Sequence, residues 1–440
     1  MAHPVDYVLR TLRARLREPR TYLILGSIYG IWIVHPLATL NGWWWLESGG
    51  VLWQLRHALI YLFVWGWLGV GMVGVPLYLF AHLARRVSTR SVPGDMLVLG
   101  LAWMGIEVIR EFLVYGFTWA HLGYLTAPSL ALMQHASWGG VYALSALLMA
   151  VCVGGVRALL WRQWRRLSYP CALAALAWGS GALLLTTYTP PEPPATLAAL
   201  HTGLSTRETT RFSGAETTLT QLEEALAAGA EVVLLPENSF PMFELNKNLA
   251  LRGDPTEGRV PALFARLTAL SRAHPDSSIV VGLHIHAPEA TYNALLSLAG
   301  GEFTSVYRKR VLMPFGEVVP PFLERKHTGT FETGARAQEF AAGGVAATPL
   351  LCSEVIYPRL AATPPTPLLL NASNDSLFSH PGVSRTNSTQ ARFRAVENRA
   401  WLVRSVKGGI SSIIAPTGAV AARSSAPDTA EVLMVSGAES

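Results

Sequence analysis

The chain has 440 residues and a formal charge of +6, yet only 15% of its residues are charged and 50% are hydrophobic. Its mean hydropathy of +0.30 is too apolar for an ordinary soluble protein, and its length leaves room for two domains. A basic charge can indicate nucleic-acid binding. That class is excluded here because the sequence has no basic helix and no basic-aromatic platform.

The N-terminal half predicts a multi-pass membrane domain. A basic segment precedes the first apolar run, and this run is too long for a signal peptide and has no small-residue cleavage site. Each run is long enough to cross a bilayer as a helix. We therefore expect about five spans within residues 1–189, at about 22–40, 58–82, 95–114, 137–157 and 170–187.

Arginines in the short connections predict the orientation of these spans. Arg85 and Arg86 follow the second span, Arg165 and Arg166 follow the fourth, and five arginines precede the first. The alternate connections contain aromatic residues and almost no basic ones. By the positive-inside rule the arginine-rich connections are cytoplasmic. An odd number of spans then places everything after Thr187 outside the cytoplasm.

One predicted span contains ionisable residues, because Glu107 and Arg110 lie three positions apart in LAWMGIEVIREF. Such residues are costly at membrane depth and are usually paired. The sequence leaves two interpretations open. The two side chains form a structural ion pair, or together with the following loop they shape an entrance that faces the lipid.

The C-terminal half, residues 190–440, predicts a globular α/β domain. A proline-rich connector, TYTPPEPPATLA, marks the boundary at about residue 190. Beyond it, apolar strand patterns such as EVVLLPE, SSIVVGLHIHA and TPLLLNASND alternate with amphipathic helical patterns such as TTLTQLEEALAAGA. This alternation is typical of a layered α/β fold.

Three blocks of the globular half carry reactive side chains. They are Glu237 in VVLLPENSF, Lys309 in VYRKRVLMPFGE and Cys352 in PLLCSEVIYP. Acyl transfer through a thioester requires such a base, cation and thiol. Glu237 and Cys352 follow apolar strands, and active sites of α/β proteins gather where strands end. Taken singly, each has an ordinary alternative: a first-turn acid, a solvated surface lysine and a core cysteine.

The cysteine count limits the possible chemistry. Cys152 and Cys171 fall in apolar segments, and Cys352 is the single cysteine of the globular half. Such a set gives neither a disulfide framework nor metal-ligand spacing. Cys352 is followed at once by the polar residues Ser353 and Glu354, so a backbone N–H there could stabilise an oxyanion. A neighbouring ammonium group would lower the pKa of the thiol.

These blocks resemble the nitrilase, or carbon–nitrogen hydrolase, superfamily in the motifs LPE, Y-x-K-x-x-L-x-P-F-G-E and a strand-end C-x-E. The PFGE block and the stretch from NASND to IIAPTG narrow the resemblance to its apolipoprotein N-acyltransferase branch. WMGIEVIREFLVYGFTWAHLGY in the membrane half is also similar to that branch. The resemblance therefore covers nearly the whole chain.

The resemblance implies a nitrilase-like αββα sandwich that is periplasmic, on the outer face of a bacterial inner membrane. It implies a two-step transfer of an acyl chain from a phospholipid to the N-terminal amine of a lipoprotein, without metal or organic cofactor. It also implies roles for individual residues: base Glu237, nucleophile Cys352, oxyanion-stabilising Lys309 and the Ser353 N–H, and supporting acids Glu317 and Glu354.

Further residues carry open interpretations. Phe240 and Phe243, in the apolar run that also contains Met242, predict either core packing or a lid that admits an acyl chain. Asn374 is a candidate substrate contact, or with Asp375 a brace for the turn after its strand. A structural ion-pair set is expected from Arg392, Arg394, Glu397 and Arg404.

The chain departs from the family pattern at three places. Ser353 stands where an aromatic residue usually follows the cysteine, Phe212 takes the place of an expected tryptophan, and no apolar run near Ser440 predicts a C-terminal span. These departures fit a divergent relative such as the TraB-type conjugal transfer proteins of plasmids. They leave two alternatives open: an amidase or amide-forming enzyme that acts on another exported polypeptide, and a non-catalytic membrane component.

Overall fold

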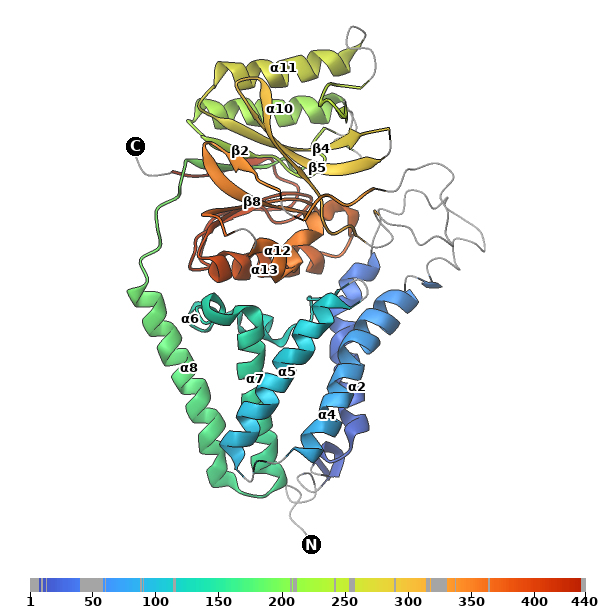
Figure 1. The fold of residues 1–440 in the computed structure, drawn as a ribbon, viewed down its shortest axis with the longest axis vertical. Coiled ribbons are helices and arrows are strands. Elements are labelled where there is room, and N and C mark those ends of the chain that lie inside the picture. The colour runs from blue at the N-terminus through green and yellow to red at the C-terminus, as the bar shows by residue number, and fades with distance from the viewer. Residues whose placement is uncertain are drawn as a thin grey trace. The chain divides into compact units, whose positions relative to one another are not determined.

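The computed structural model divides into two compact units, Met1–Tyr188 and Thr189–Ser440 (Figure 1). It describes residues 8–436 except 9–10, 13, 40–57, 60, 88, 90, 114–115, 206–207, 209–211, 241–242, 253–257, 289, 314–316, 318–330, 337 and 363–364. Met242 and residues 314–316 of the PFGE motif therefore lie outside the described part of the chain.

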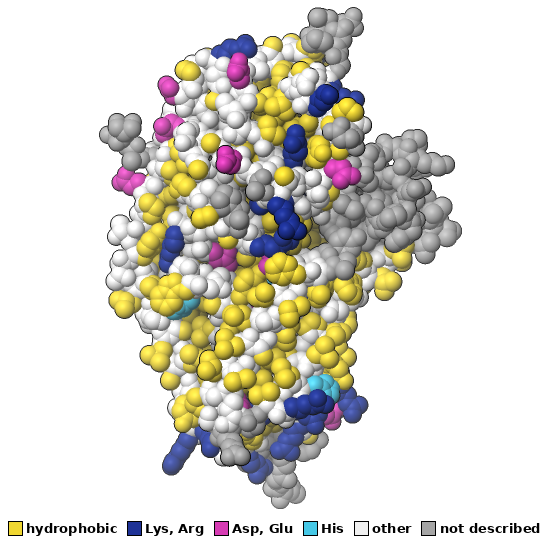
Figure 2. All heavy atoms as spheres, in the orientation of Figure 1, with side chains coloured by type: hydrophobic (Ala, Val, Ile, Leu, Met, Phe, Trp, Pro, Cys, Tyr) yellow, Lys and Arg dark blue, Asp and Glu magenta, His cyan; other side chains and the backbone are white. Residues whose placement is uncertain are grey.

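Within the described residues, the first unit contains five helices long and apolar enough to cross a membrane: Pro19–Thr39, Leu62–Arg86, Val92–Phe112, Ala136–Leu160 and Trp164–Thr187. They contain α2 (Pro19–Val34), the π-helical η2 (Leu62–Gly74) with α4 (Val75–Arg86), α5 (Val92–Phe112), α7 (Ala136–Leu160) and α8 (Ser168–Thr187). Large apolar side chains such as Trp32 and Trp178 are exposed on them, and Figure 2 shows hydrophobic side chains over this unit. Such a surface suits contact with lipid.

Small residues allow these helices to pack closely in pairs. A Cβ atom on Gly30 of α2 would collide with the carbonyl oxygen of Gly69 in η2, and Gly26 lies against Gly74 in the same way. In a second pair, Gly100 of α5 leaves room for the backbone of Ala146 in α7. Small residues at such contacts let two backbones approach closely, as is common between membrane helices.

The ionisable residues of α5 form a buried structural pair. Arg110 Nη2 lies 3.9 Å from Glu107 Oε1, and both side chains are buried. Glu107 accepts hydrogen bonds from Trp103 Nε1 and from the backbone N–H of Leu122, each 2.9 Å long. Arg110 Nη1 donates to the carbonyl oxygen of Met72 over 3.0 Å. The contacts therefore support the ion-pair interpretation.

The second unit is an αββα sandwich, which confirms the predicted fold class. One sheet has the order β13-β1-β2-β4-β5-β6, with β3 paired to β4, and the other has the order β12-β11-β10-β9-β8-β7. Helices α10 and α11 lie on one outer side and α12 and α13 on the other (Figure 1). The elements of the first sheet and its helices are β1 (Leu197–His201), β2 (Val232–Leu234), β3 (Glu244–Asn246), β4 (Ser278–His286), β5 (Thr291–Ala299), β6 (Glu302–Arg308), β13 (Glu431–Val435), α10 (Phe212–Ala227) and α11 (Arg259–Ala273).

The elements of the second sheet and its helices are β7 (Ala341–Ala342), β8 (Val345–Leu351), β9 (Leu368–Asn374), β10 (Trp401–Lys407), β11 (Ser412–Ile414), β12 (Val420–Arg423), the 3₁₀ segment η6 (Cys352–Ile356), α12 (Pro358–Ala361) and α13 (Gly382–Asn398). Strands β8, β9 and β10 are parallel, with Leu351 opposite Ala372 and Lys407 opposite Asn374. This register brings their C-terminal ends to one edge of the sheet.

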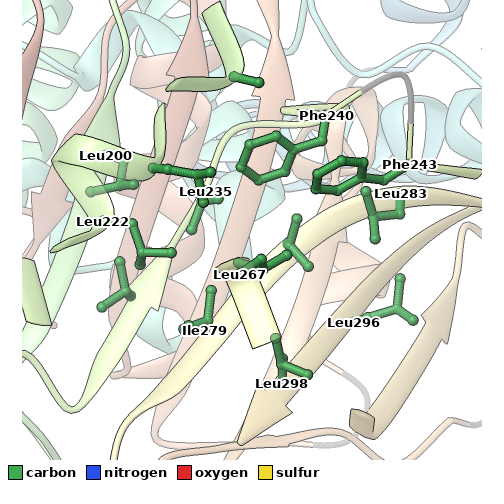
Figure 3. Close-up of a cluster of buried hydrophobic side chains, with 14 of the residues drawn as sticks. Leu200, Leu222, Leu235, Phe240, Phe243, Leu267, Ile279, Leu283, Leu296 and Leu298 are labelled. Carbon is green, nitrogen blue, oxygen red and sulfur yellow. The ribbon is translucent and has the colours of Figure 1, made fainter. Parts of the chain in front are cut away.

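Two hydrophobic cores hold the sandwich together. The inner core lies between the sheets and includes Leu234, Leu295, Leu351 and Leu370. The outer core lies between the first sheet and its helices, and Figure 3 shows Leu222, Leu235, Phe240 and Phe243 among its side chains. The central strands β1, β2, β9 and β10 are buried along their whole length, which explains why they read as continuous apolar runs.

Candidate active site

Three strand ends bring the predicted reactive side chains together. Glu237 follows β2, Lys309 follows β6 directly, and Cys352 follows β8 directly. All three side chains are buried, with 7%, 1% and 8% of their surfaces exposed. The electrostatic interactions of Cys352 include both Glu237 and Lys309. The folded chain therefore places a carboxyl, an ammonium and a thiol in one buried cluster, although they come from two different sheets.

The backbone at Cys352 has an unusual conformation. Its φ angle is +53°, in the left-handed region that non-glycine residues rarely adopt. The chain turns there from β8 into the 3₁₀ segment η6. Such outliers persist only where the surrounding structure enforces them, and they cluster at active sites. A sharp strand-to-helix turn also carries the nucleophile at a strand end in α/β-hydrolases.

Lys309 is held in its charged form by carboxylates. Its Nζ lies 2.8 Å from Glu317 Oε2. Burial would lower the pKa of the Lys309 ammonium, but Glu317, together with Cys352 and Glu237, raises that pKa above its ordinary value. The cluster therefore contains a permanent positive charge beside the thiol.

Glu237 is a buried carboxyl with a raised pKa. Burial is the largest cause, and Lys309 partly opposes it. The Cys352 thiol is one of the groups that affect the pKa of this carboxyl, and Asn293 Nδ2 donates to Glu237 Oε1 over 2.9 Å. A carboxyl in this setting has a pKa closer to neutrality than a solvated one, as a general base requires.

Asn293 is a site residue that the sequence did not reveal. The same Nδ2 that donates to Glu237 also donates to Glu317 Oε1 over 2.7 Å. One amide group therefore joins the proton acceptor to the carboxylate that pairs with the lysine. Asn293 lies on β5, a strand with no motif around it, so only the pairing of β5 with its neighbours could place it here.

The thiol of Cys352 is protonated at rest. Burial and then the negative charge of Glu237 raise its pKa, while Lys309 lowers it only in part. A thiol in this state becomes a nucleophile when its proton leaves during attack. Glu237 is a buried carboxyl that interacts electrostatically with this thiol.

Glu354 is fully buried and accepts four hydrogen bonds. Tyr307 Oη donates to it over 2.7 Å, and backbone N–H groups of Leu351, Arg310 and Val311 donate over 2.8, 2.7 and 3.0 Å. Two of these N–H groups directly follow Lys309, and one directly precedes Cys352. Glu354 therefore ties the turn that carries the lysine to the turn that carries the thiol.

A chain of polar side chains leads away from the Cys352 thiol. Ser373 Oγ is 3.8 Å from Cys352 Sγ and 3.0 Å from Asp375 Oδ1. Arg404 Nη2 donates to Asp375 Oδ2 over 2.8 Å, and its Nη1 donates to Asn371. Because Asp375 raises the pKa of the Cys352 thiol, the buried guanidinium of Arg404 offsets a charge that would oppose a thiolate.

A second buried lysine, Lys407, interacts electrostatically with Glu237. Its Nζ donates to the carbonyl oxygen of Asn238 over 2.7 Å. Burial lowers the pKa of Lys407 to about 7, and Glu237 partly counters this effect. Asn238 has a φ of +51°, so the lysine fastens a strained residue next to the proton acceptor. This contact could not be predicted from the sequence, because Asn238 and Lys407 are distant in the chain and no motif links them.

Gly282 of β4 makes room for Glu237. A Cβ atom at this position would lie 3.0 Å from the backbone nitrogen of Asn238 and 3.2 Å from Glu237 Cα. Both distances are closer than packed backbone tolerates without movement. A side chain at this position would therefore have to push the backbone at Glu237 and Asn238 slightly away from β4.

Other predicted residues occupy less reactive places. Phe240 and Phe243 stack in the outer core with ring centroids 4.7 Å apart (Figure 3), so the structure gives them the packing role rather than a place in the cluster. Asn374 accepts a hydrogen bond from Ser376 over 2.6 Å, as a brace of its turn would. Ser353 is the second residue of η6 and is half-buried.

The predicted ion-pair set is divided in the structure. Arg394 Nε pairs with Glu397 Oε2 at 2.7 Å, within α13. Arg392 donates instead to the carbonyl oxygen of Gly418, and Arg404 pairs with Asp375 beside the thiol. As for metals, the described residues contain no cluster of three His, Cys, Asp or Glu side chains that could hold an ion.

Two family models match this chain. The carbon–nitrogen hydrolase model matches residues 197–436, which is more than half of the sequence. The chain belongs to the carbon–nitrogen hydrolase family. The model of the apolipoprotein N-acyltransferase N-terminal domain matches residues 7–154, so this carbon–nitrogen hydrolase lies in the apolipoprotein N-acyltransferase branch and is a membrane protein.

Curated relatives agree with that branch. The apolipoprotein N-acyltransferase of Geobacter metallireducens is 28% identical, with 90% of this chain and 78% of the relative covered. The enzyme of the same name from Pseudomonas syringae is 26% identical, with 94% and 82% covered. The predicted likeness to conjugal transfer proteins stays a prediction.

Two solved structures are similar to about half of this chain. Saccharomyces cerevisiae Nit3 is 16% identical with a TM-score of 0.41, covering 55% of this chain and 89% of that one. An amidase from Nesterenkonia sp. is 19% identical with a TM-score of 0.42, covering 56% and 90%.

Proposed function

We propose that this chain is a membrane-bound N-acyltransferase. It forms a thioester at Cys352 from a phospholipid and transfers the acyl chain to the N-terminal amine of an exported lipoprotein. The observation that carries the proposal is the buried cluster in which Cys352, on a left-handed turn, interacts electrostatically with Glu237 and with the charged Lys309. The two matched family models and the names of the relatives support the same activity.

In the first step, the thiol proton of Cys352 moves to Glu237 while Sγ attacks the ester carbonyl of the phospholipid. The negative charge that develops on the carbonyl oxygen is stabilised by the Lys309 ammonium and by the backbone N–H of Ser353. The intermediate then collapses, the C–O bond breaks, and Glu237 returns the proton to the leaving lysophospholipid oxygen. The products are an acyl-Cys352 thioester and a lysophospholipid.

In the second step, the free amine of the acceptor attacks the thioester carbonyl. Glu237 takes one proton from the amine nitrogen, and the same two donors hold the oxyanion. The C–S bond breaks, Glu237 returns its proton to the departing sulfur, and an amide is released. Because the raised pKa of Lys309 keeps its charge through both steps, this lysine stabilises charge and does not exchange protons.

The supporting residues have positioning roles in this scheme. Glu317 fixes the Lys309 ammonium through their 2.8 Å contact, and Asn293 orients the carboxyl of Glu237. Glu354 holds the two turns in register through its four hydrogen bonds. The arginine pattern supports a cytoplasmic position for the connections after α4 and α7, which leaves the catalytic unit on the periplasmic side of the inner membrane.

A labelling experiment tests the proposal. Purified full-length protein is incubated with phospholipid that carries a labelled acyl chain, and we expect a labelled adduct that hydroxylamine releases, as it does from thioesters. The adduct should disappear in Cys352→Ala and persist in Cys171→Ala, a cysteine outside the cluster. Addition of a peptide with a free N-terminal amine should move the label to the peptide as an amide.

The amidase alternative rests on Ser353, which stands where the family usually has an aromatic residue. The same experiment separates the two functions. An amidase would pass its acyl group to water and leave the peptide unlabelled. If free labelled fatty acid is released at the same rate with and without peptide, the protein is a hydrolase and not an acyltransferase. A folded protein that forms no adduct from phospholipid would reject the first step.

A further inference from the structure

The helical unit contains an apolar cavity between two helix pairs. One pair is α2 with η2–α4 and the other is α5 with α7, and each pair packs closely through its glycines. Between the pairs remains a cavity of about 550 Å³, with walls formed by residues of all these helices, including Tyr29, Leu77, Leu99 and Val153. Such a volume lies within the range of small-molecule and lipid-tail sites.

The cavity has a basic end and a long apolar wall. Arg17, Arg85 and Arg157 contribute to its lining together with Leu160, while most of the other lining side chains are apolar. Along α7 the wall runs from Met149 to Leu160, which at 1.5 Å per residue is about 16 Å. That length is close to half of the hydrocarbon core of a bilayer, which is about 30 Å thick. The wall therefore matches one leaflet.

Polar bridges join the two helix pairs. Arg157, which lines the cavity, pairs through Nε with Asp95 Oδ2 at 3.0 Å, and its Nη2 donates to the carbonyl oxygen of Ala84, so it joins α7 and α5 to α4. Arg110 of α5 also donates to the carbonyl oxygen of Met72 in η2. The guanidinium of Arg157 is therefore already paired with Asp95 within the helical unit.

Arg17 and Arg85 differ from Arg157 because both are exposed. Among the residues that the structure describes, neither forms an ion pair. Two guanidinium groups therefore remain available at the mouth of an apolar cavity. Guanidinium is the side-chain group that best matches phosphate oxygens, through paired N–H donors.

The distribution of basic side chains indicates which side of the membrane the basic end of the cavity faces. Basic side chains gather at the lower end of this unit in Figure 2, and by the positive-inside rule this is the cytoplasmic end. The cytoplasmic leaflet carries anionic lipids that attract such residues. An unfilled apolar cavity of this size is also unfavourable, because the atoms of its walls would lack packing partners.

We propose that this cavity binds one acyl chain of an anionic glycerophospholipid from the cytoplasmic leaflet, with the headgroup phosphate held by Arg17 and Arg85. The bound lipid connects the α2–α4 pair to the α5–α7 pair. This site is distinct from the thiol cluster, and its occupancy is independent of the chemistry at Cys352.

Native mass spectrometry of the full-length protein tests the site. The protein is reconstituted with equal amounts of phosphatidylglycerol and phosphatidylcholine that carry identical acyl chains, and is then extracted gently. We expect one retained phosphatidylglycerol per chain, and about tenfold less retention in the double variant Arg17→Gln/Arg85→Gln. Arg86→Gln is the matched control, because Arg86 follows Arg85 directly and does not line the cavity.

A second pair of variants tests the acyl-chain part. Cys152 lines the cavity whereas Cys171 of α8 does not, so Cys152→Phe should reduce lipid retention and Cys171→Phe should not. Inorganic phosphate should not raise the Tm of the extracted protein, whereas phosphatidylglycerol should. Equal retention of both lipids, an equal loss in Arg86→Gln, or full retention in Cys152→Phe would each overturn the proposal.

Discussion

Both units of this chain bury charged side chains, but they use them differently. In the helical unit, Glu107 accepts hydrogen bonds from an indole N–H and a backbone N–H, and Arg110 donates to a backbone carbonyl. None of these donors releases its proton under ordinary conditions. The cluster in α5 can therefore hold helices together, and the groups that donate hydrogen bonds to Glu107 are not proton donors.

In the second unit, Glu237 and the Cys352 thiol each affect the pKa of the other. Burial raises the pKa of the carboxyl and also that of the thiol, while Lys309 stays charged beside them. The comparison teaches that burial of charge is not itself a sign of catalysis. Reactivity requires a transferable proton next to the buried carboxyl.

The largest effect is expected from Glu237→Gln, which removes the proton acceptor and keeps the shape. We expect the rate of thioester formation to fall about 10²- to 10⁴-fold, as for loss of a general base, with little change in Tm. Glu354→Gln is the matched control, because it replaces another buried glutamate of the same unit. The four hydrogen bonds of Glu354 are structural, so Glu354→Gln should lose about 1–3 kcal/mol of stability. Its rate of thioester formation per folded molecule should fall much less than that of Glu237→Gln.

The pH dependence of thioester formation sharpens this test. Because Glu237 must be ionised to accept a proton and its pKa is raised, the rate should rise with pH through that raised pKa. The rising limb should be absent from Glu237→Gln. If the rate of thioester formation in this variant still rises with pH in the same way, another group causes the rise, and the role of Glu237 is contradicted.

In the helical unit, Arg110→Met should cost about 3–5 kcal/mol of stability, because it leaves Glu107 buried without its cation. The double variant Arg110→Met/Glu107→Gln should recover part of the loss. Thermal unfolding in detergent measures both. Activity per folded molecule should stay at the level of the unaltered protein, and a specific loss of thioester formation would show that this cluster contributes to the chemistry after all.

Lys407→Met should change how stability depends on pH. Burial lowers the pKa of Lys407 from 10.5 to about 7, so between these values the folded state binds fewer protons than the unfolded state. Stability of the unaltered protein should therefore rise with pH from about 7 to 10.5. The variant should lack this rise and should melt a few degrees higher at pH 6, since 1 kcal/mol shifts Tm by about 2–4 °C.

The exposed Lys247 provides the control for that measurement. Lys247→Met should leave the pH profile of Tm unchanged. A profile that stays the same in Lys407→Met would mean that Lys407 keeps an ordinary pKa despite its burial.

The smallest effect is expected from Ser373→Ala. Loss of a hydroxyl 3.8 Å from Cys352 Sγ should slow thioester formation about 2- to 10-fold, the range of one ordinary hydrogen bond. The pH profile of Cys352 alkylation by iodoacetamide should also shift upward, which a purely structural effect would not cause. Ser376→Ala serves as control, because Ser376 bonds to Asn374 in the same turn.

Much of the architecture could be predicted from the sequence. Apolar runs of sufficient length and the placement of arginines predict membrane helices and their direction. Alternating strand and helix patterns predict the α/β class, which the two sheets confirm. The motifs around Glu237, Lys309 and Cys352 pointed to the residues that the fold gathers, because each stands at or near the end of a strand.

The sequence could not decide which partners surround them. Asn293 joins Glu237 to Glu317, Arg404 offsets Asp375, and Lys407 fastens Asn238. Each contact crosses between strands or loops that are distant in the chain. Phe240 and Phe243 were likewise ambiguous, since an apolar run has the same composition in a core as in a lid.

Local sequence determines which segments become strands and helices, because periodicity and propensity act over a few residues. Tertiary structure alone decided the strand order and register that bring β2, β5, β8 and β10 around one thiol. Buried charges acquire their pKa values only after this assembly, since desolvation and neighbouring charges depend on three-dimensional distance and not on position in the chain.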